Sequence, residues 1–184
     1  FRHRDVRELL AAEWFDDLLK KGHRRAVEAL IFREQYGEQI ITPRMRPILP
    51  WLILFDEEIR AKVLALEPEI AMEGGDAAGL PIVERQKLLH DVIERLISGD
   101  GSRSVSDNSA IARIAQEDLA GDALKLIEKY ADHDDAIFFL GRLVWQGDMK
   151  ACVPALLRIA ANSERGKYAR IAATRAVMTC GDAE

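Results

Sequence analysis

Two stretches near the C-terminal end of the sequence decide the expected fold: AIFFLGRLVWQGD (residues 136–148) and RIAATRAVMTCGD (residues 170–182). The segment VPALLRIAA (153–161), which lies between them, has the apolar spacing of a further helix. A repeat made of a helix, a turn and a second helix is typical of helical-hairpin solenoids. At an offset of 34 residues the two stretches agree at five positions, which pair Ile137 with Ile171, Leu143 with Val177, Val144 with Met178, and Gly147-Asp148 with Gly181-Asp182.

The remaining sequence extends this pattern to an all-α fold, in which antiparallel helical hairpins are stacked as a short HEAT-like α-solenoid. Helical periodicity recurs along the chain, whereas the alternation of a half-buried strand is almost absent. Of the 184 residues, 48% are hydrophobic and only 7% are aromatic, a balance that favours helix over strand. Stacking buries the apolar face that each hairpin cannot bury alone. We expect a continuous apolar seam formed by Leu30, Leu52, Leu89, Ile127 and Leu143.

Glycine and proline residues place the helices of the first half. We expect helices over about 4–20 and 24–35, with a glycine after each, and then a loop that continues to Thr42. Prolines restrict the residues before them and are tolerated in a first helical turn, so the next helix is expected to start near Pro43 or Pro47. Its apolar side chains, which should point into the core, are Trp51, Leu52 and Phe55.

The stretch EGGDAAGLP (73–81) is the clearest break in the pattern. We expect it to separate an N-terminal part, residues 1–72, from an array of HEAT-like helical repeats, residues 73–184. The helix IVERQKLLHDVIERLI that follows the break is strongly amphipathic. Residues expected to cap helices with their side chains are Asp56 and either Ser106 or Asp107.

Charge and composition exclude several classes of partner and location. The net charge of −5 argues against nucleic acid, because phosphate binding requires clustered Lys and Arg. The longest apolar run, PILPWLILF (47–55), is shorter than the roughly 20 residues of a membrane-spanning helix. The two cysteines, Cys152 and Cys180, have no metal-binding spacing and are expected to be small core residues in a reducing compartment. We therefore expect a cytoplasmic protein with neither nucleic acid nor membrane as a partner.

Motifs for catalysis are weak in this sequence. The Gly166-Lys167 pair is followed by Tyr168 and has no glycine five residues earlier, so it does not form a phosphate-binding P-loop. Neither cysteine has a histidine neighbour, and no G-x-S-x-G motif occurs. The tryptophans fall at apolar helical positions and are expected to be in the core; they are Trp14, Trp51 and Trp145.

At two places in the sequence a His is followed directly by an Asp, a pattern that could indicate a helical metal-dependent phosphohydrolase. They are His90-Asp91 and His133-Asp134, and such a site would also need a further His and Asp to converge on the same metal. The only other histidines are His3 and His23, far upstream. The alternative, that His90 lies on the polar face of its helix and that residues 132–135 form an acidic N-cap, is preferred.

The opening segment FRHRDVRELLAA resembles the motif that closes the winged-helix region of NACHT-type ATPases, members of the STAND superfamily. In that family the motif reads roughly F-x-H-x-[ST]-x-x-E-[FY]-[LF]-A-A. Asp5 replaces the usual Ser or Thr, and Leu9 replaces an aromatic residue. The later segment PWLILFDEEIRAKVLALEPEIAMEGGD resembles the stretch before HEAT-like repeats in bacterial STAND proteins. The positions that match the closing motif are Phe1, His3, Glu8, Leu10, Ala11 and Ala12.

The resemblance implies that residues 1–72 comprise the end of a winged-helix region and the first helical pairs. It also implies that an upstream ATPase module holds ATP or ADP with Mg²⁺, whereas this segment binds no cofactor by itself. In the family, the histidine of the motif reaches the phosphates of the bound nucleotide, and this role maps onto His3. The alternative is that His3 is an ordinary residue at a helix start.

Two functional hypotheses follow. In the first, the segment couples the nucleotide state of a cytoplasmic signalling ATPase, such as one of bacterial defence, to a protein partner or trigger. In the second, it belongs to a free-standing HEAT-like scaffold with no nucleotide role. Neither hypothesis makes the segment itself an enzyme, and a phosphohydrolase is a distant third. A P-loop upstream would support the first hypothesis.

Overall fold

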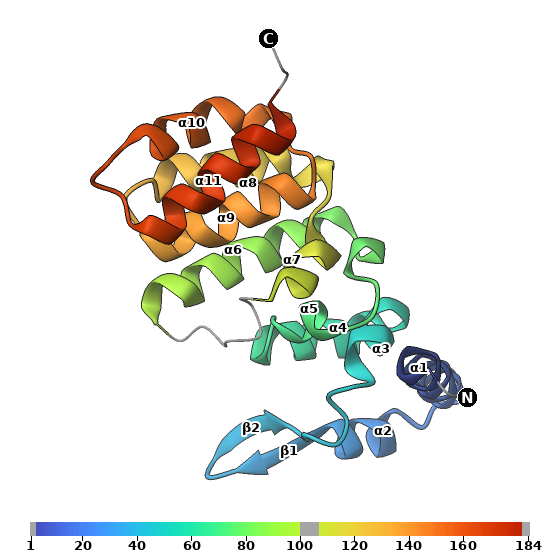
Figure 1. Ribbon diagram of the computed structural model, residues 1–184. Coiled ribbons are helices and arrows are strands. Elements are labelled where there is room, and N and C mark those ends of the chain that lie inside the picture. Colours follow the sequence, from blue (N-terminus) through green and yellow to red (C-terminus); the bar gives the residue numbers. More distant parts are fainter. Residues whose placement is uncertain (1–2, 100–106, 182–184) are drawn as a thin grey trace. The chain divides into compact units, whose positions relative to one another are not determined.

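The computed structural model of the chain describes residues 3–99 and 107–181 (Figure 1). Most of these residues are helical, as predicted, and eleven α-helices occur among them. The chain forms two compact units, Phe1–Leu80 and Pro81–Glu184. Each unit has its own buried apolar core, so the two are described separately.

In the first unit the helices gather around a short central one, α3 (Leu49–Phe55), which contacts α1, α4 and α5. Pro50 is tolerated in its first turn, where a backbone N–H has no helical partner. Leu49, Leu52 and Ile53 are fully buried. The other helical elements are α1 (Arg4–Lys20), α2 (Arg24–Ile31), α4 (Glu57–Leu66), α5 (Ile70–Glu73) and the 3₁₀ turn η1 (Ala77–Gly79).

A β-hairpin in the first unit corrects the all-α prediction. Helix α2 ends at Ile31, and the chain continues as two antiparallel strands, β1 (Phe32–Gln35) and β2 (Glu38–Ile41). Tyr36 and Gly37 join the strands with φ angles of 55° and 83°, and positive φ at both central residues is the requirement of a type I′ turn. The predictions of helix up to Gln35 and of a loop up to Thr42 were therefore wrong.

Ionic contacts tie the segments of the first unit together. Asp56 caps α4 as predicted, because its Oδ1 accepts a hydrogen bond of 2.8 Å from the Ile59 N–H. The Arg24 guanidinium binds the same carboxylate at 3.2 and 2.7 Å. Arg46 forms a bidentate ion pair with the Glu73 carboxylate, at 2.7 and 2.8 Å, and also binds Glu67. These contacts anchor α2 to the start of α4, and the residues before α3 to the C-terminal ends of α4 and α5.

Most of the break at residues 73–81 belongs to the packed structure of the first unit, which ends at Leu80. Gly75 has a φ of +64°, and a Cβ on it would lie 2.3 Å from the carbonyl oxygen of Pro50. The positive φ favours glycine, and the close approach to α3 leaves no room for any side chain.

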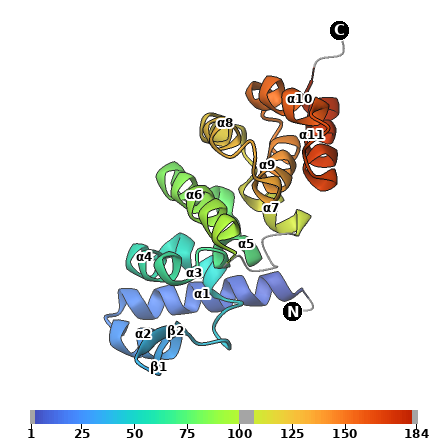
Figure 2. The same cartoon turned by 90° about the vertical axis from the view of Figure 1, so that its left-hand side faces the viewer.

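The second unit contains six α-helices among its described residues, and five of them form two layers. Figure 2 shows α8 and α10 side by side in one layer and α7, α9 and α11 in the other, and the contacts between these helices agree. The hairpin α8–α9 is followed by the hairpin α10–α11, and a short 3₁₀ turn precedes each. The bounds are α6 (Ile82–Ser98), α7 (Asn108–Ile114), η3 (Glu117–Leu119), α8 (Ala120–Lys129), α9 (Asp134–Gln146), η4 (Lys150–Cys152), α10 (Val153–Ala161) and α11 (Lys167–Cys180).

Helices α9 and α11 approach each other closely because small residues line their contact. A Cβ on Gly141 of α9 would lie 3.0 Å from both the carbonyl carbon and the Cβ of Ala172 in α11. Near the end of the same contact, the Cys180 thiol lies 3.5 Å from the Val144 carbonyl oxygen. The buried alanines of α11 are Ala169, Ala172, Ala173 and Ala176.

Polar side chains fix the ends of elements in the second unit. Arg85 of α6 binds the Asp118 carboxylate of η3 at 2.7 and 2.5 Å. Asp107 caps α7 as predicted, by accepting a hydrogen bond of 3.1 Å from the Ser109 N–H. Ser106, the alternative cap, lies outside the described residues.

Burial confirms most of the residues predicted for the core, with clear exceptions. Leu52, Leu89, Ile127 and Leu143 are no more than 1% exposed. Leu30 is 53% exposed, because α2 turns Val27 and Ile31 inward instead, and Phe55 is 41% exposed at the end of α3. These two positions are corrections to the predicted core.

Candidate functional site

His3 lies at the start of α1, as predicted. It is the N-cap residue, with extended backbone angles (φ −87°, ψ 127°), and its carbonyl oxygen accepts a 3.4 Å hydrogen bond from the Arg7 N–H. The residue is exposed, and its imidazole makes no capping hydrogen bond to the helix. The side chain is therefore available to an external group. Phe1, the first residue of the motif, lies outside the described residues.

An apolar stripe runs along the exposed side of α1. It consists of Val6, Leu10 and Trp14, which are 39%, 41% and 58% exposed and follow one another at intervals of four residues. Residues four apart lie on the same face of a helix. The opposite face is buried through Ala12, Phe15 and other residues of α1. The prediction that Trp14 lies in the core was thus wrong, and we name the three residues the α1 stripe.

The two His-Asp pairs occupy different local settings. The His90 side chain is 43% exposed on α6, and its Nε2 lies 4.0 Å from Asp122 Oδ1. His133 is the N-cap of α9, and its Nδ1 accepts a 3.3 Å hydrogen bond from the Ala136 N–H. The predicted acidic cap of α9 is thus replaced by a histidine, because the imidazole nitrogen is placed to accept this bond.

The part of the chain that the structure describes contains neither a cluster of metal ligands nor an exposed thiol. No three His, Cys, Asp or Glu side chains come together there in a way that could hold a metal ion. Both cysteines are free and buried, as predicted for core residues. Burial raises the pKa of the Cys152 thiol to about 11, so it is protonated at neutral pH and a poor nucleophile.

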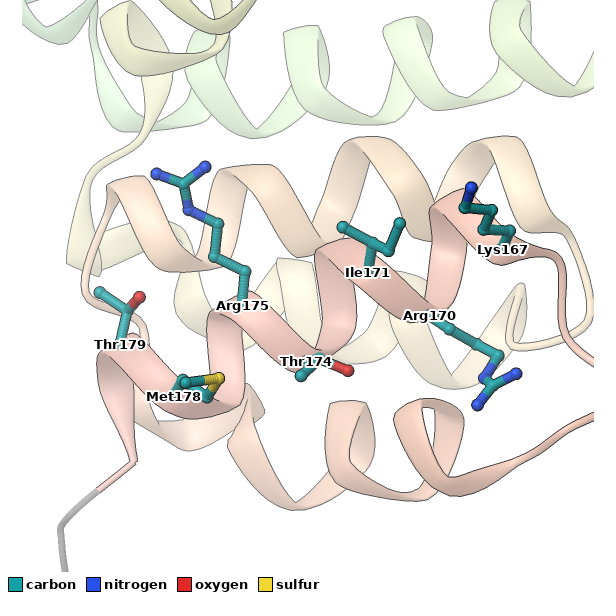
Figure 3. A pocket seen from close by; sticks show the side chains of 7 residues that line it. All are labelled: Lys167, Arg170, Ile171, Thr174, Arg175, Met178 and Thr179. Carbon is teal, nitrogen blue, oxygen red and sulfur yellow. The ribbon is translucent and has the colours of Figure 1, made fainter.

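A second exposed surface, which the sequence did not identify, lies on α11. Its outer side lines a concave space of about 790 Å³. Figure 3 shows Arg170 and Arg175 extending to opposite edges of this surface, with Ile171 and Thr174 between them and Met178 beyond Arg175 toward the C-terminal end of α11. Ile171 is 50% exposed and Met178 is 80% exposed. We name the surface formed by Lys167 and these five residues the α11 face.

The helical repeat in the sequence does not distinguish this surface from the core. Ile171 and Met178 align with Ile137 and Val144 of α9, which are both fully buried. The apolar pattern of the repeat alone does not separate these exposed positions from the buried ones.

Comparisons with known protein families, with curated proteins and with solved structures gave no significant match. No helix among the described residues is both long and apolar enough to span a bilayer.

Proposed function

We propose that this chain is the helical coupling and sensor segment of a cytoplasmic NACHT-type STAND signalling ATPase, such as one of bacterial defence. It acts by binding other protein surfaces and not by catalysis. One side receives the state of an upstream module that holds ATP or ADP with Mg²⁺. The other recognises a protein partner or trigger.

The observation that carries this proposal is the combination of His3 and the α1 stripe on one helix. The motif that resembles the end of the winged-helix region coincides with the first turns of α1. The α1 stripe gives the same helix an apolar surface that a neighbouring module would cover. An imidazole beside this surface, with no bond to its own helix, could donate to a nucleotide phosphate.

We further propose that the second unit is a short HEAT-like solenoid. Two features support this: the order of 3₁₀ turn, helix and helix occurs twice, and the 34-residue offset of the sequence repeat relates α9 to α11. Gly147 and Gly181 stand at equivalent places, immediately after α9 and α11. Solenoids of this kind present extended surfaces for protein partners.

The test is the rate of ADP release from a protein that carries this chain after its nucleotide-binding module. A hydrogen bond to a charged phosphate is worth about 1.5–3 kcal/mol, so His3→Ala should accelerate ADP release by roughly ten- to a hundredfold. His23→Ala is the matched control, because His23 is also an N-cap residue without a capping side-chain bond, at the start of α2. Its ADP release should equal that of the unaltered protein.

The free-standing scaffold is the alternative function, and the same experiment distinguishes it. Equal ADP release with and without the His3 imidazole would make His3 an ordinary residue at a helix start and favour the scaffold.

A further inference from the structure

The α11 face combines an apolar centre with basic edges. Lys167, Arg170 and Arg175 supply three positive charges, and no acidic side chain is among the described residues that line the space. Ile171 and Thr174 lie between the two arginines, and Met178 continues the apolar surface beyond Arg175 (Figure 3). The face extends from Lys167 to Met178, which is about three helical turns.

The neighbouring hairpin indicates what shape of partner covers such a surface. On α9, Gly141 and Val144 face α11: the first lies against Ala172 and the second against Cys180. The equivalent positions 34 residues later are Arg175 and Met178, both on the α11 face. The part of α9 that is covered by a helix thus corresponds to the part of α11 that is exposed.

Helices α9 and α11 differ in charge at these equivalent positions. This difference indicates the charge of the partner that would cover α11. Where α9 has Gly141 inside a tight contact between small residues, α11 has Arg175, whose guanidinium lies 4.0 Å above the ring of Trp145. Arg170 defines the other edge, where its Nε donates to the Ala160 carbonyl oxygen at 3.4 Å. Both side chains are thereby held beside the apolar centre. A helix lying between these cations gains most from carboxylates on both of its flanks.

We propose that the α11 face is a docking site for an acidic amphipathic helix of a partner protein. Apolar side chains of that helix would cover Ile171 and Met178, and its Asp or Glu residues would pair with Lys167, Arg170 and Arg175. The inference deepens the proposed sensor function by naming the class of partner. It does not depend on nucleotide binding, so its test and the ADP-release test can fail separately.

The test uses the full 184-residue chain and synthetic helical peptides of about 20 residues, a length at which isolated helices begin to form. The acidic peptide has leucines at positions i, i+3 and i+7 and glutamates on both flanks, and the control peptide has lysines in place of the glutamates. In fluorescence anisotropy the acidic peptide should bind at least about tenfold more tightly than the lysine peptide. Equal affinity, or no binding of the acidic peptide, would overturn the proposal.

Protein variants locate the binding. Met178→Glu should weaken binding of the acidic peptide at least about tenfold. Leu157→Glu is the matched control: Leu157 is 54% exposed on α10, does not line the space, and its substitution adds the same charge. This control should leave the affinity unchanged. Lys167→Glu should weaken binding of the acidic peptide and strengthen that of the lysine peptide. If Met178→Glu and Leu157→Glu behave alike, the α11 face is not the site.

Two other occupants are tested with the same variants. A dimer of the chain that dissociates on Met178→Glu, seen by light scattering, would assign the face to a second copy and refute the proposal. Binding to phosphatidylserine vesicles that is lost on Met178→Glu would assign it to a membrane surface, because basic amphipathic helices bind anionic lipid. The proposal requires a monomeric chain and no vesicle binding that depends on Met178.

Discussion

The tight crossing of α9 and α11 makes Gly141 the position most sensitive to a single added carbon atom. In Gly141→Ala the new Cβ would lie 3.0 Å from the Cβ and the carbonyl carbon of Ala172, and 3.2 Å from its carbonyl oxygen. Two of these three atoms belong to the backbone, so a rotation of a side chain cannot relieve the contact. Helix α11 must shift as a body, and its buried alanine face opposes that shift.

The magnitude follows from two opposing effects. Overpacking a tight core contact costs about 1–3 kcal/mol. Alanine is favoured over glycine inside a helix by about 0.5–1 kcal/mol, which offsets part of this cost. We therefore expect Gly141→Ala to lower the free energy of unfolding by up to about 2.5 kcal/mol.

Gly121→Ala is the matched control for this experiment. Gly121 is an exposed residue in the first turn of α8, and a Cβ there would meet no atom within 4 Å. This variant should be more stable than the unaltered chain by about 0.4–1 kcal/mol. Urea denaturation followed by circular dichroism measures both variants. If Gly141→Ala gains as much stability as Gly121→Ala, the close approach of α9 and α11 is refuted.

Two further predictions concern Asp56 and Cys152. Asp56→Ala removes both the cap of α4 and the closest partner of Arg24, so it should destabilise the chain by about 1–3 kcal/mol in urea denaturation. Glu58→Ala is the control, because the Glu58 side chain is exposed and lies 3.5 Å from Arg24. This variant should cost less than about 0.5 kcal/mol. Burial raises the pKa of Asp56, but hydrogen bonds from Arg24 and from the Ile59 N–H outweigh it, so the folded pKa lies below the ordinary value of 3.8. The stabilisation by the ionised Asp56 carboxylate is therefore present above pH 3.8 and is lost as the pH falls through the folded pKa. The destabilisation by Asp56→Ala should shrink over the same pH range. An effect as large in acid as at pH 7 would contradict this. Because the pKa of Cys152 is about 11, a thiol reagent at pH 8 should leave Cys152 unmodified in the folded chain. The same reagent should modify Cys152 in concentrated urea. Rapid labelling of Cys152 in the folded chain would contradict its burial.

Long helices could be predicted from the sequence because several of their turns repeat the same apolar spacing. Helix α6 is the clearest case, with Leu88, Leu89, Val92 and Ile93 all buried. Side-chain caps at Asp56 and Asp107 were equally readable, since a short acidic residue before a helical run has few other local roles. These features depend on neighbours that are close in the sequence.

The hairpin was missed because its strands are too short for a pattern. Each has four residues, and the apolar spacing of Val27 and Ile31 could be extended without contradiction to Gln35. The usable signal was the pair Tyr36-Gly37 between REQ and EQI, where glycine supplies one of the two positive φ angles of the turn. Tyrosine at the other position concealed it, because Asn or Asp is usual there.

The two candidate surfaces escaped prediction for a different reason. Apolar spacing shows that Leu10, Trp14, Ile171 and Met178 share helix faces with other apolar residues, but it does not show whether a face meets a neighbour within the same chain. Only the packing of α1 and α11 separates covered positions from exposed ones. A face of this kind is thus first identified by its exposure in the structure.

A coupling role demands more than the presence of two binding surfaces on one chain. Coupling is a free energy shared between two sites, and it is reciprocal: if a partner on the α11 face changes the affinity for ADP by some factor, ADP must change the affinity for that partner by the same factor. The His3 and Met178 variants each alter one site directly, because these residues belong to different units. Measured together in one protein, they form a thermodynamic cycle. A factor of one would leave two separate binding surfaces on a scaffold, even if each bound its ligand as proposed, whereas any other factor is the quantity that a sensor requires.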